Sequence, residues 1–288
     1  MAAGSSSFLR DLGARLVTAV VAVPILLALA FLGPNYALWV LLAGAAAIGA
    51  HEYVRMTLGD ATGPDRTVVV LGVFATLSAG YWSPHPIAVY ATVSFTIIAT
   101  LVLTLRTAAD AMDQAAARIG HLLGGYAWMA ALFGGLLIPC ATDTPFATGP
   151  HQAAWLLFPM FTVWAGDTGA YFAGRAFGRT KLAPRVSPKK TREGAVGGLV
   201  ASVGGAYLAW WLLPFPAGME AWHVLAFAVP GAILGQVGDL CESVIKRSTG
   251  VKDSGTILYG HGGMLDRVDG LIFAAPWFAT LKALLELP

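Results

Sequence analysis

Long apolar segments of similar length recur along the chain, separated by short polar stretches. They lie near residues 15–33, 35–50, 67–82, 86–105, 121–139, 153–174, 195–214, 222–241 and 271–287. A helix needs about 20 mostly apolar residues to cross a bilayer, with a range of about 17 to 25. The pattern therefore predicts an all-α integral membrane protein with about nine transmembrane helices.

The composition supports a location in the membrane. Of the 288 residues, 57% are hydrophobic and 12% are charged, and the mean hydropathy is +0.68. Ordinary soluble domains contain about 25% charged residues. The formal net charge of +2 argues against nucleic acid as a partner, because that would require a broad basic surface.

The positions of Lys and Arg predict the orientation, because short cytoplasmic loops are enriched in both. With the N-terminus in the cytoplasm and the C-terminus outside, all of the 18 basic residues except Lys282 fall on the cytoplasmic side. Seven of them lie in residues 175–194 and four in residues 242–269. Arg10 and Arg15 precede the first segment, which we interpret as an uncleaved span because no small-x-small cleavage site ends it.

Several common site types are not expected. Cys140 and Cys241 are predicted to lie at opposite membrane faces, so we expect no disulfide. The six histidines are scattered along the chain, which argues against zinc. The sequence contains no G-x-x-x-x-G-K-[ST] loop, no G-x-G-x-x-G after a strand and no G-x-S-x-G elbow.

Four aspartates stand out, because a carboxylate at membrane depth is costly and usually marks a site. Asp167 lies in WAGDTGAY and Asp239 lies in GQVGDLCES, near the inner ends of two predicted spans. Asp266 and Asp269 are three positions apart, so they share one face at the start of the last span. Hard oxygen ligands of this kind suit magnesium, which binds one or two carboxylates together with substrate phosphates.

Purely structural roles for these acidic residues remain open. Asp167 could pair with Arg175 in the same segment. Glu242 and Lys246 have the spacing of an ordinary helix pair. The carboxylates of Asp266 and Asp269 would also suit the N-terminal end of a helix dipole.

Two segments carry features of a phosphate site. SPKKT, residues 187–191, has two lysines and two hydroxyls, and Arg192 follows. Lysine is a point-charge ligand for phosphate, and hydroxyls add donors. The glycines of GHGG, residues 260–263, would let backbone amides approach a phosphate or a nucleotide. Attraction of anionic lipid headgroups by surface charge alone is the simpler alternative.

The same segments resemble a known family. S-x-x-K-R-x-x-x-x-K-D-x-G at residues 243–255, followed by G-H-G-G-x-x-D-R-x-D at residues 260–269, is similar to the signature of phosphatidate cytidylyltransferases, the integral membrane CDP-diacylglycerol synthases. W-A-x-D-x-x-A-Y-x-x-G at residues 164–174 and S-P-x-K-T-x-E-G at residues 187–194 agree with it. The specific resemblance covers residues 160–280, whereas residues 1–150 agree only in being a run of spans.

The resemblance implies transfer of a cytidylyl group from CTP to phosphatidate, giving CDP-diacylglycerol and pyrophosphate in phospholipid biosynthesis. It implies Mg²⁺ and a second, monovalent cation such as K⁺, and a homodimer in the cell inner (plasma) membrane with its site facing the cytoplasm. Residues 1–150 would form N-terminal transmembrane helices. Residues 151–288 would form a catalytic transmembrane region with charged cytoplasmic loops at 175–194 and 242–269.

Site roles follow from the chemistry of the acidic residues and from positions in the matched motifs. The predicted magnesium ligands are Asp239, Asp266, Asp269 and Asp167, and the predicted catalytic set is Asp239, Asp266, Asp269, Lys246 and Arg267. The predicted substrate-binding residues are Ser187, Lys190, Thr191, Arg192, Ser243, Arg247, Lys252, His261, Gly262 and Gly263.

Other functions remain open at this point. A related lipid nucleotidyltransferase or a polyprenol kinase would use the same metal and phosphate chemistry. An ion-coupled transporter would also place acidic residues in the membrane, but it predicts broken spans in two corresponding halves. Here the charge gathers at one face and no internal repeat is visible.

Overall fold

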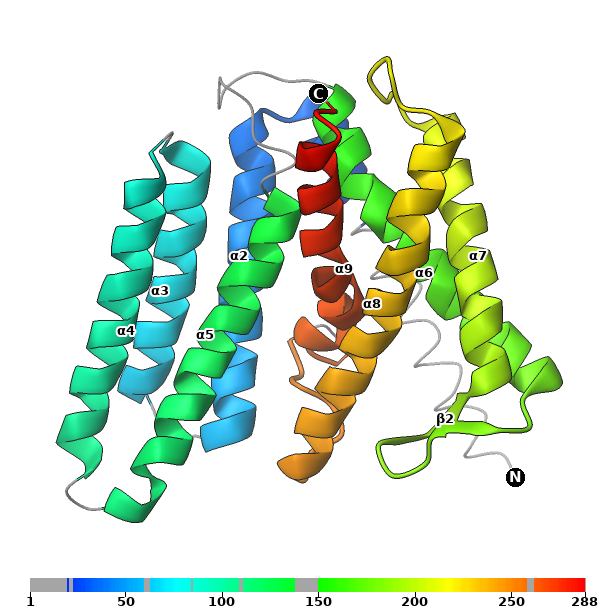
Figure 1. Cartoon of the computed structure of the whole chain (residues 1–288). Helices are drawn as coiled ribbons and strands as arrows, with labels where there is room; N and C mark the ends of the chain where they lie inside the picture. The colour runs from blue at the N-terminus through cyan, green and yellow to red at the C-terminus, as the bar shows by residue number, and fades with distance from the viewer. Residues whose placement is uncertain are drawn as a thin grey trace.

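The chain folds as a bundle of long helices with one small hairpin (Figure 1). The computed structural model describes residues 20, 23–59, 63–83, 85–108, 111–137, 150–257 and 262–287. A short apolar helix, Val23–Leu32, comes first. The later elements are α2 (Asn35–Leu58), α3 (Gly63–Trp82), α4 (Pro86–Ala108), the 3-10 helix η1 (Met112–Gln114), α5 (Ala115–Leu137), α6 (Pro150–Phe177), β1 (Lys181–Ala183), β2 (Ser187–Thr191), α7 (Arg192–Leu212), α8 (Ala221–Ser248) and α9 (Leu265–Leu284).

The predicted helical fold is confirmed in its coarse form. Among the described residues, five helices are long and apolar enough to cross a membrane: Tyr36–Leu58, Pro86–Arg106, Met112–Leu137, Arg192–Leu212 and Ala221–Ser248. Helices α3, α6 and α9 coincide with the other predicted spans and run alongside these five (Figure 1). Of the predicted first span, residues 15–33, the structure describes residues 20 and 23–33, and the short helix Val23–Leu32 lies within it.

The helices extend beyond the apolar segments that predicted them. Helix α8 continues past the predicted end at residue 241 to Ser248, and α9 begins at Leu265 instead of residue 271. Each of α6 and α8 has 28 residues, which corresponds to roughly 42 Å of helix against a hydrocarbon core of about 30 Å. Their polar ends can therefore carry functional groups beyond the apolar layer.

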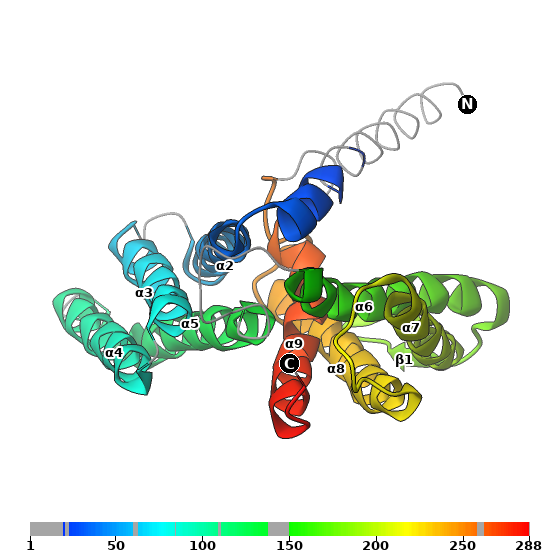
Figure 2. The same ribbon diagram turned by 90° about the horizontal axis from the view of Figure 1, so that it is seen from above.

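Helices from the two halves of the chain meet at α9. In the view from above, α2 to α5 lie on one side of α9, and α6, α7 and α8 lie on the other (Figure 2). Phe158 on α6, Phe227 on α8 and Phe278 on α9 are buried and contact one another, with ring centroids 5.2 to 5.5 Å apart. Such pairs contribute about 0.5–1.5 kcal/mol each beyond the area they bury. This aromatic core fixes the three helices that carry the predicted acidic residues.

Helices α6 and α7 pack through small residues. A Cβ atom on Gly169 would lie 2.9 Å from the carbonyl oxygen of Gly197, and one on Gly198 would lie 3.0 Å from that of Gly166. Small residues at a membrane helix interface permit such close backbone approach. The close packing holds the end of α6 against the start of α7.

The segment between α6 and α7 corrects the prediction of an open loop and of a purely helical fold. Strands β1 and β2 pair antiparallel, with Lys181 opposite Thr191 and Ala183 opposite Ser187. Lysine and proline are depleted in strands, which is why SPKKT suggested a loop. Cys241 is a free, half-buried thiol, whereas Cys140 lies outside the described residues.

Candidate active site

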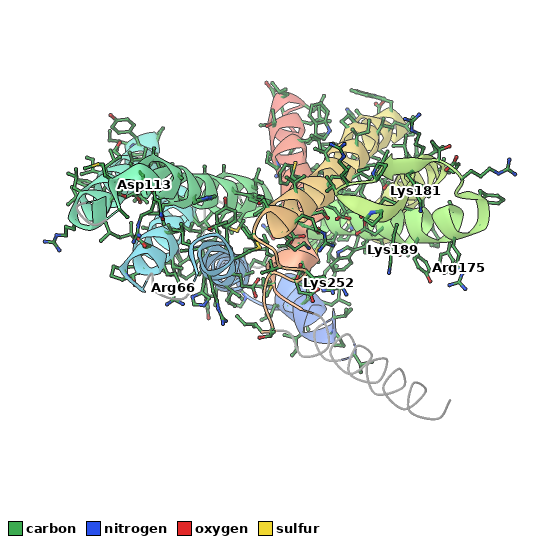
Figure 3. All side chains as sticks on the ribbon, turned by 90° about the horizontal axis from the view of Figure 1, so that it is seen from below. Arg66, Asp113, Arg175, Lys181, Lys189 and Lys252 are labelled. Carbon is green, nitrogen blue, oxygen red and sulfur yellow. The ribbon has the colours of Figure 1, made fainter. Side chains whose placement is uncertain are left out.

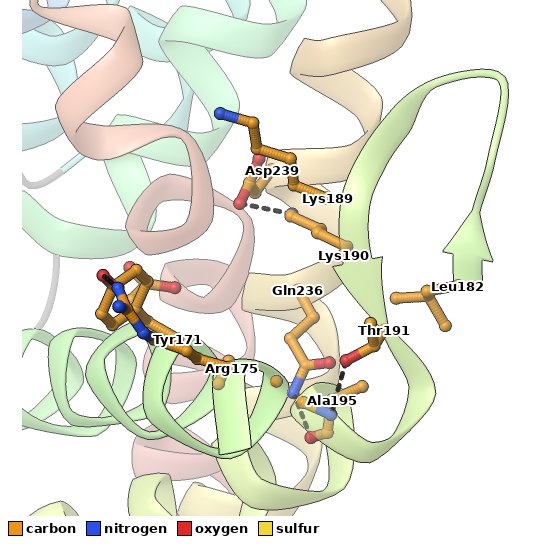
Figure 4. Close-up of a pocket in the computed structure, with 13 residues that line it drawn as sticks. Tyr171, Arg175, Leu182, Lys189, Lys190, Thr191, Ala195, Gln236 and Asp239 are labelled. Carbon is orange, nitrogen blue, oxygen red and sulfur yellow. Dashed lines mark hydrogen bonds and ion pairs between the residues drawn. The ribbon is translucent and has the colours of Figure 1, made fainter. Parts of the chain in front are cut away.

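A pocket of about 490 Å³ lies between the end of α6, the hairpin, the start of α7 and the middle of α8 (Figure 4). It therefore joins the two segments that the sequence singled out separately, residues 164–174 and residues 187–194. Its lining consists of Asp167, Ala170, Tyr171, Gly174, Arg175, Leu182, Lys189, Lys190, Thr191, Gly194, Ala195, Gln236 and Asp239.

One wall of the pocket pairs a lysine of the hairpin with an aspartate of α8. The ammonium group of Lys190 forms an ion pair with Asp239, and the two side chains are 29% and 33% exposed (Figure 4). They are therefore accessible to a ligand. Lys189 also lines the pocket and is exposed. Gln236 closes the same wall, because its Nε2 donates to the carbonyl oxygen of Ala195, at 3.0 Å.

The remaining residues of the SPKKT segment have different positions. Thr191 is buried, and its Oγ1 accepts a hydrogen bond from the amide of Gly194 at 3.1 Å, so it caps the start of α7. Ser187 and the exposed Arg192 do not line the pocket. Glu193 accepts hydrogen bonds from the backbone amides of Arg179 and Thr180 at 3.1 to 3.2 Å. The threonine thus lines the pocket and caps α7, and the glutamate ties the start of α7 to the turn after α6.

Three of the predicted metal ligands converge from three helices. Asp167 of α6 and Asp269 of α9 lie close enough to Asp239 of α8 for their charges to repel one another, and Lys190 offsets part of this repulsion. Arg175, the alternative partner for Asp167, donates to the hydroxyl of Tyr171 at 3.2 Å.

The fourth, Asp266, is held in a separate network. Its Oδ1 accepts from the ammonium of Lys246 at 2.7 Å, and its Oδ2 accepts from the amides of Ser254 and Gly263, each at 2.9 Å. Lys246 also donates to Glu242 at 2.7 Å. The predicted helix pair of Glu242 and Lys246 is therefore present.

The buried Glu242 joins this network to the other aspartates. Its side chain is 0% exposed, and the charge of Asp269 acts on it directly. Lys246 lies between Glu242 and Asp266 and offsets both charges. A helix pair that the sequence presented as ordinary is therefore part of the acidic group.

The loop between α8 and α9 depends on a glycine in the left-handed region. Gly262 has φ of +80°, which L side chains rarely adopt, and a Cβ there would lie 2.9 Å from Oδ2 of Asp266. This geometry brings the amide of Gly263 to Asp266. A contact of these glycines with a phosphate stays a prediction, and His261 lies outside the described residues.

The other predicted substrate residues lie around the same loop. Ser243 is buried, and its Oγ lies 3.5 Å from Oδ1 of Asp239. Arg247 donates to the carbonyl oxygen of Val251 at 3.4 Å. Lys252 and Arg267 are exposed. In the view from below, Lys252 shares the charged end of the bundle with Arg66, Arg175, Lys181 and Lys189 (Figure 3).

A residue of the N-terminal half was missed by sequence reasoning. Glu52 of α2 is 2% exposed, and its carboxylate accepts hydrogen bonds from the loop and from the first turn of α9. The available signal was a carboxylate two positions beyond a predicted span, on the α2 helix that extends past it, where an unsatisfied charge is costly. No motif marked it, because its partners lie about two hundred positions away.

The acidic residues have the donor chemistry of a magnesium site but do not form one as they stand. Within the described residues, no three His, Cys, Asp or Glu side chains are grouped so that they could hold a metal ion. Lys190 and Lys246 supply the positive charge beside Asp239 and Asp266. Carboxylate oxygens from several helices are nevertheless the ligands that magnesium prefers.

Comparison with known proteins agrees with this arrangement. Residues 13–285 match the model of the cytidylyltransferase family. Relatives named phosphatidate cytidylyltransferase include one from Pseudomonas aeruginosa, 36% identical over 276 residues that cover 93% of this chain and 95% of the relative. Another, from Synechocystis sp., is 32% identical over 285 residues that cover 91% of this chain and 93% of the relative.

Other relatives match over about half of the chain. A phosphatidate cytidylyltransferase from Brucella suis is 47% identical over 139 residues, or 48% of this chain. That match spans 50% of the relative's own length. The chain therefore spans about half the length of the first relatives, and nearly the whole length of those from Pseudomonas and Synechocystis. Since the family model spans almost the whole chain, the protein belongs to the cytidylyltransferase family.

Proposed function

We propose that this protein transfers a cytidylyl group from CTP to phosphatidate, giving CDP-diacylglycerol and pyrophosphate. The observation that carries the proposal is the pocket in which Lys189 and Lys190 face Asp167 and Asp239. Cationic groups for phosphates and acidic groups for a cation meet there at the end of apolar helices. The names of the relatives supply the substrates.

The reaction needs little proton chemistry from the protein. The phosphate monoester of phosphatidate is already anionic at neutral pH, so its oxygen can act as the nucleophile without a general base. That oxygen forms a bond to the α-phosphorus of CTP, and the bond from this phosphorus to the pyrophosphate oxygen breaks. The protein's task is to bring two anions together and to stabilise the transferring group.

The side chains of the pocket fit this task. Lys190 and Lys189 would neutralise phosphate oxygens. To do so, Lys190 would leave Asp239, its present ion-pair partner, and bind a phosphate instead. Lys246, Arg247, Lys252 and Arg267 would add positive charge from the side of the loop. Ser243 lies beside Asp239 and would keep its carboxylate oriented.

Magnesium fits the acidic residues by their chemistry. We propose that Asp239 and Asp266 hold it, with Asp269 and Asp167 supporting the site or binding a second, monovalent cation such as K⁺. When bound, the cation would neutralise the phosphates of CTP and the departing pyrophosphate. Because lysines pair with Asp239 and Asp266 here, binding requires these ammonium groups to turn toward the substrates.

The surroundings of the pocket suggest how the lipid enters. Tyr171 and Phe172 on α6 and Val196 and Val200 on α7 are 59% to 68% exposed, next to pocket residues of the same helices. An apolar surface of this kind suits contact with acyl chains. We propose an inner-membrane protein with nine spans, a cytoplasmic site and a lateral opening, working as a homodimer.

The test uses the purified full-length chain in phospholipid vesicles. Labelled CTP and phosphatidate should give equimolar pyrophosphate and a labelled liponucleotide, and chelation of divalent cations with EDTA should stop the reaction until Mg²⁺ is restored. Transfer to another lipid phosphate but not to phosphatidate would indicate a related nucleotidyltransferase. Transfer of a terminal phosphate to a polyprenol would indicate a kinase, and cation flux without CTP turnover would indicate a transporter.

A further inference from the structure

Helix α9 begins without a cap of its own. Its N-cap residue, Met264, makes no side-chain capping hydrogen bond, and the first amides of a helix need acceptors. Glu52 of α2 provides them: Oε1 accepts from the amide of Met264 at 3.0 Å, and Oε2 accepts from that of Leu265 at 2.9 Å. A carboxylate at a helix N-terminus is also favoured by the helix dipole.

The same carboxylate holds the loop before α9. Ser254 donates its hydroxyl to Oε2 of Glu52 at 3.2 Å. The Ser254 hydroxyl in turn accepts the amide of Asp266 at 3.3 Å, and the amide of Ser254 donates to Oδ2 of Asp266 at 2.9 Å. Ser254 is thus the bridge between Glu52 and Asp266. Both Glu52 and Ser254 are buried, at 2% and 7% exposure.

Two glycines of the loop pack so closely against Glu52 that a larger side chain would collide with it. A Cβ atom on Gly263 would lie 2.6 Å from Oε2 of Glu52 and 2.7 Å from the amide nitrogen of Gly255. A Cβ on Gly255 would lie 2.8 Å from Cδ of Glu52. The glycines of the K-D-x-G and G-H-G-G segments therefore have a packing reason, since they make room for a side chain from the other half of the protein.

We propose that Glu52 is a positioning residue for the reaction. It joins Ser254 and the first turn of α9 to α2, and it acts through Ser254 to set the carboxylate of Asp266. The N-terminal half thereby takes part in catalysis without contacting a substrate. The inference rests on the proposed function, because Asp266 is a site residue only if that function holds.

The test compares Glu52→Gln with a matched control. Asp65 of α3 is also a buried carboxylate of the N-terminal half, at 0% exposure, and it pairs with Arg118 away from the loop. Both Glu52→Gln and Asp65→Asn lose a buried charge, so both lower the unfolding temperature. Glu52→Gln alone replaces an acceptor beside two backbone amides with a donor.

The expected result is specific to the loop. In folded protein, Glu52→Gln lowers kcat by about tenfold or more, as expected for the loss of hydrogen bonds to a charged group, and changes the KM for phosphatidate by less than about twofold. Hydrogen exchange at the amides of Met264 and Leu265 becomes faster. Asp65→Asn keeps the kcat of the wild type and the exchange of these two amides.

Ser254→Ala provides a second test if Glu52→Gln does not fold. It removes the bridge while leaving Glu52 in place, so kcat falls and the amide of Asp266 exchanges faster, and a wild-type kcat in Ser254→Ala overturns the inference. Where Glu52→Gln also folds, the double variant loses less kcat than the product of the single losses. A wild-type kcat in Glu52→Gln, or equal kcat losses in Glu52→Gln and Asp65→Asn, overturns the inference. If the wild type transfers no cytidylyl group, the proposed function itself is wrong, whatever the amide exchange shows.

Discussion

The ammonium group of Lys246 on α8 lies 2.7 Å from Oδ1 of Asp266 on α9. Because Lys246 also pairs with Glu242, which is 0% exposed, one cation compensates two acidic groups. Lys246→Met would leave a buried carboxylate without a partner, which costs about 3–5 kcal/mol when a buried pair is broken. We expect a lower unfolding temperature in detergent and a loss of transfer activity.

A second variant separates these two effects. Lys246→Met combined with Glu242→Gln removes the buried charge as well as its partner, so it should recover part of the lost unfolding free energy. Activity should stay low because Asp266 still lacks its cation. Recovery of both stability and activity would contradict a role for Lys246 in the reaction.

Asp266→Asn should abolish cytidylyl transfer while leaving expression and membrane insertion unchanged. The asparagine amide would present a donor either to Lys246 or to the amides of Ser254 and Gly263, where the carboxylate now accepts. Transfer of label from CTP to phosphatidate measures the loss. The control is Asp113→Asn on η1, which changes an exposed aspartate and should keep full activity. An active Asp266→Asn enzyme would contradict the proposed role of Asp266 in the reaction.

Lys190→Gln should raise the KM for CTP by about tenfold or more, since a charge-assisted contact to a phosphate is worth about 1.5–3 kcal/mol. Lys189→Gln, which alters the more exposed neighbouring lysine of the pocket, should have a smaller effect. Steady-state kinetics at fixed phosphatidate density distinguish the two. Equal effects of both variants would mean that the hairpin acts only through its total charge.

Replacing each of two adjacent glycines on α7 with alanine should have different effects on the free energy of unfolding. A Cβ on Gly205 would lie 2.7 Å from the carbonyl oxygen of Phe161 on α6, whereas one on Gly204 would meet nothing within 4 Å. Gly205→Ala should therefore cost about 1–3 kcal/mol through overpacking, and Gly204→Ala should be neutral or stabilise by up to about 1 kcal/mol. Thermal unfolding of the two variants in the same detergent measures the difference.

The helices were predictable because a bilayer demands long apolar segments, and each predicted span from residue 35 onward coincides with a helix. Their ends were not, because hydropathy reports the apolar layer and not where backbone hydrogen bonding stops. Helix α8 thus carries Lys246 beyond the predicted end of its span at residue 241. The hairpin was missed because a strand of five residues containing Pro188 and two lysines has almost no periodic signal.

The site was predictable where its residues lie in compact motifs and not where partners are distant. Asp167, Asp239 and Lys190 were singled out by their local pattern, and the structure brings them to one pocket, while their roles stay predictions. Thr191 lines the same pocket, and its hydroxyl caps α7, a contact that the sequence did not distinguish from binding of phosphate. Glu52 could not be assigned, because its meaning depends on a loop of the other half.

The position of the pocket beside the exposed aromatic side chains of α6 has a kinetic consequence. If substrate and product both keep their tails among neighbouring lipids, turnover is set by encounters in two dimensions. The relevant concentration of phosphatidate is then its mole fraction in the leaflet, and diluting it with inert phospholipid at constant bulk concentration should slow the enzyme.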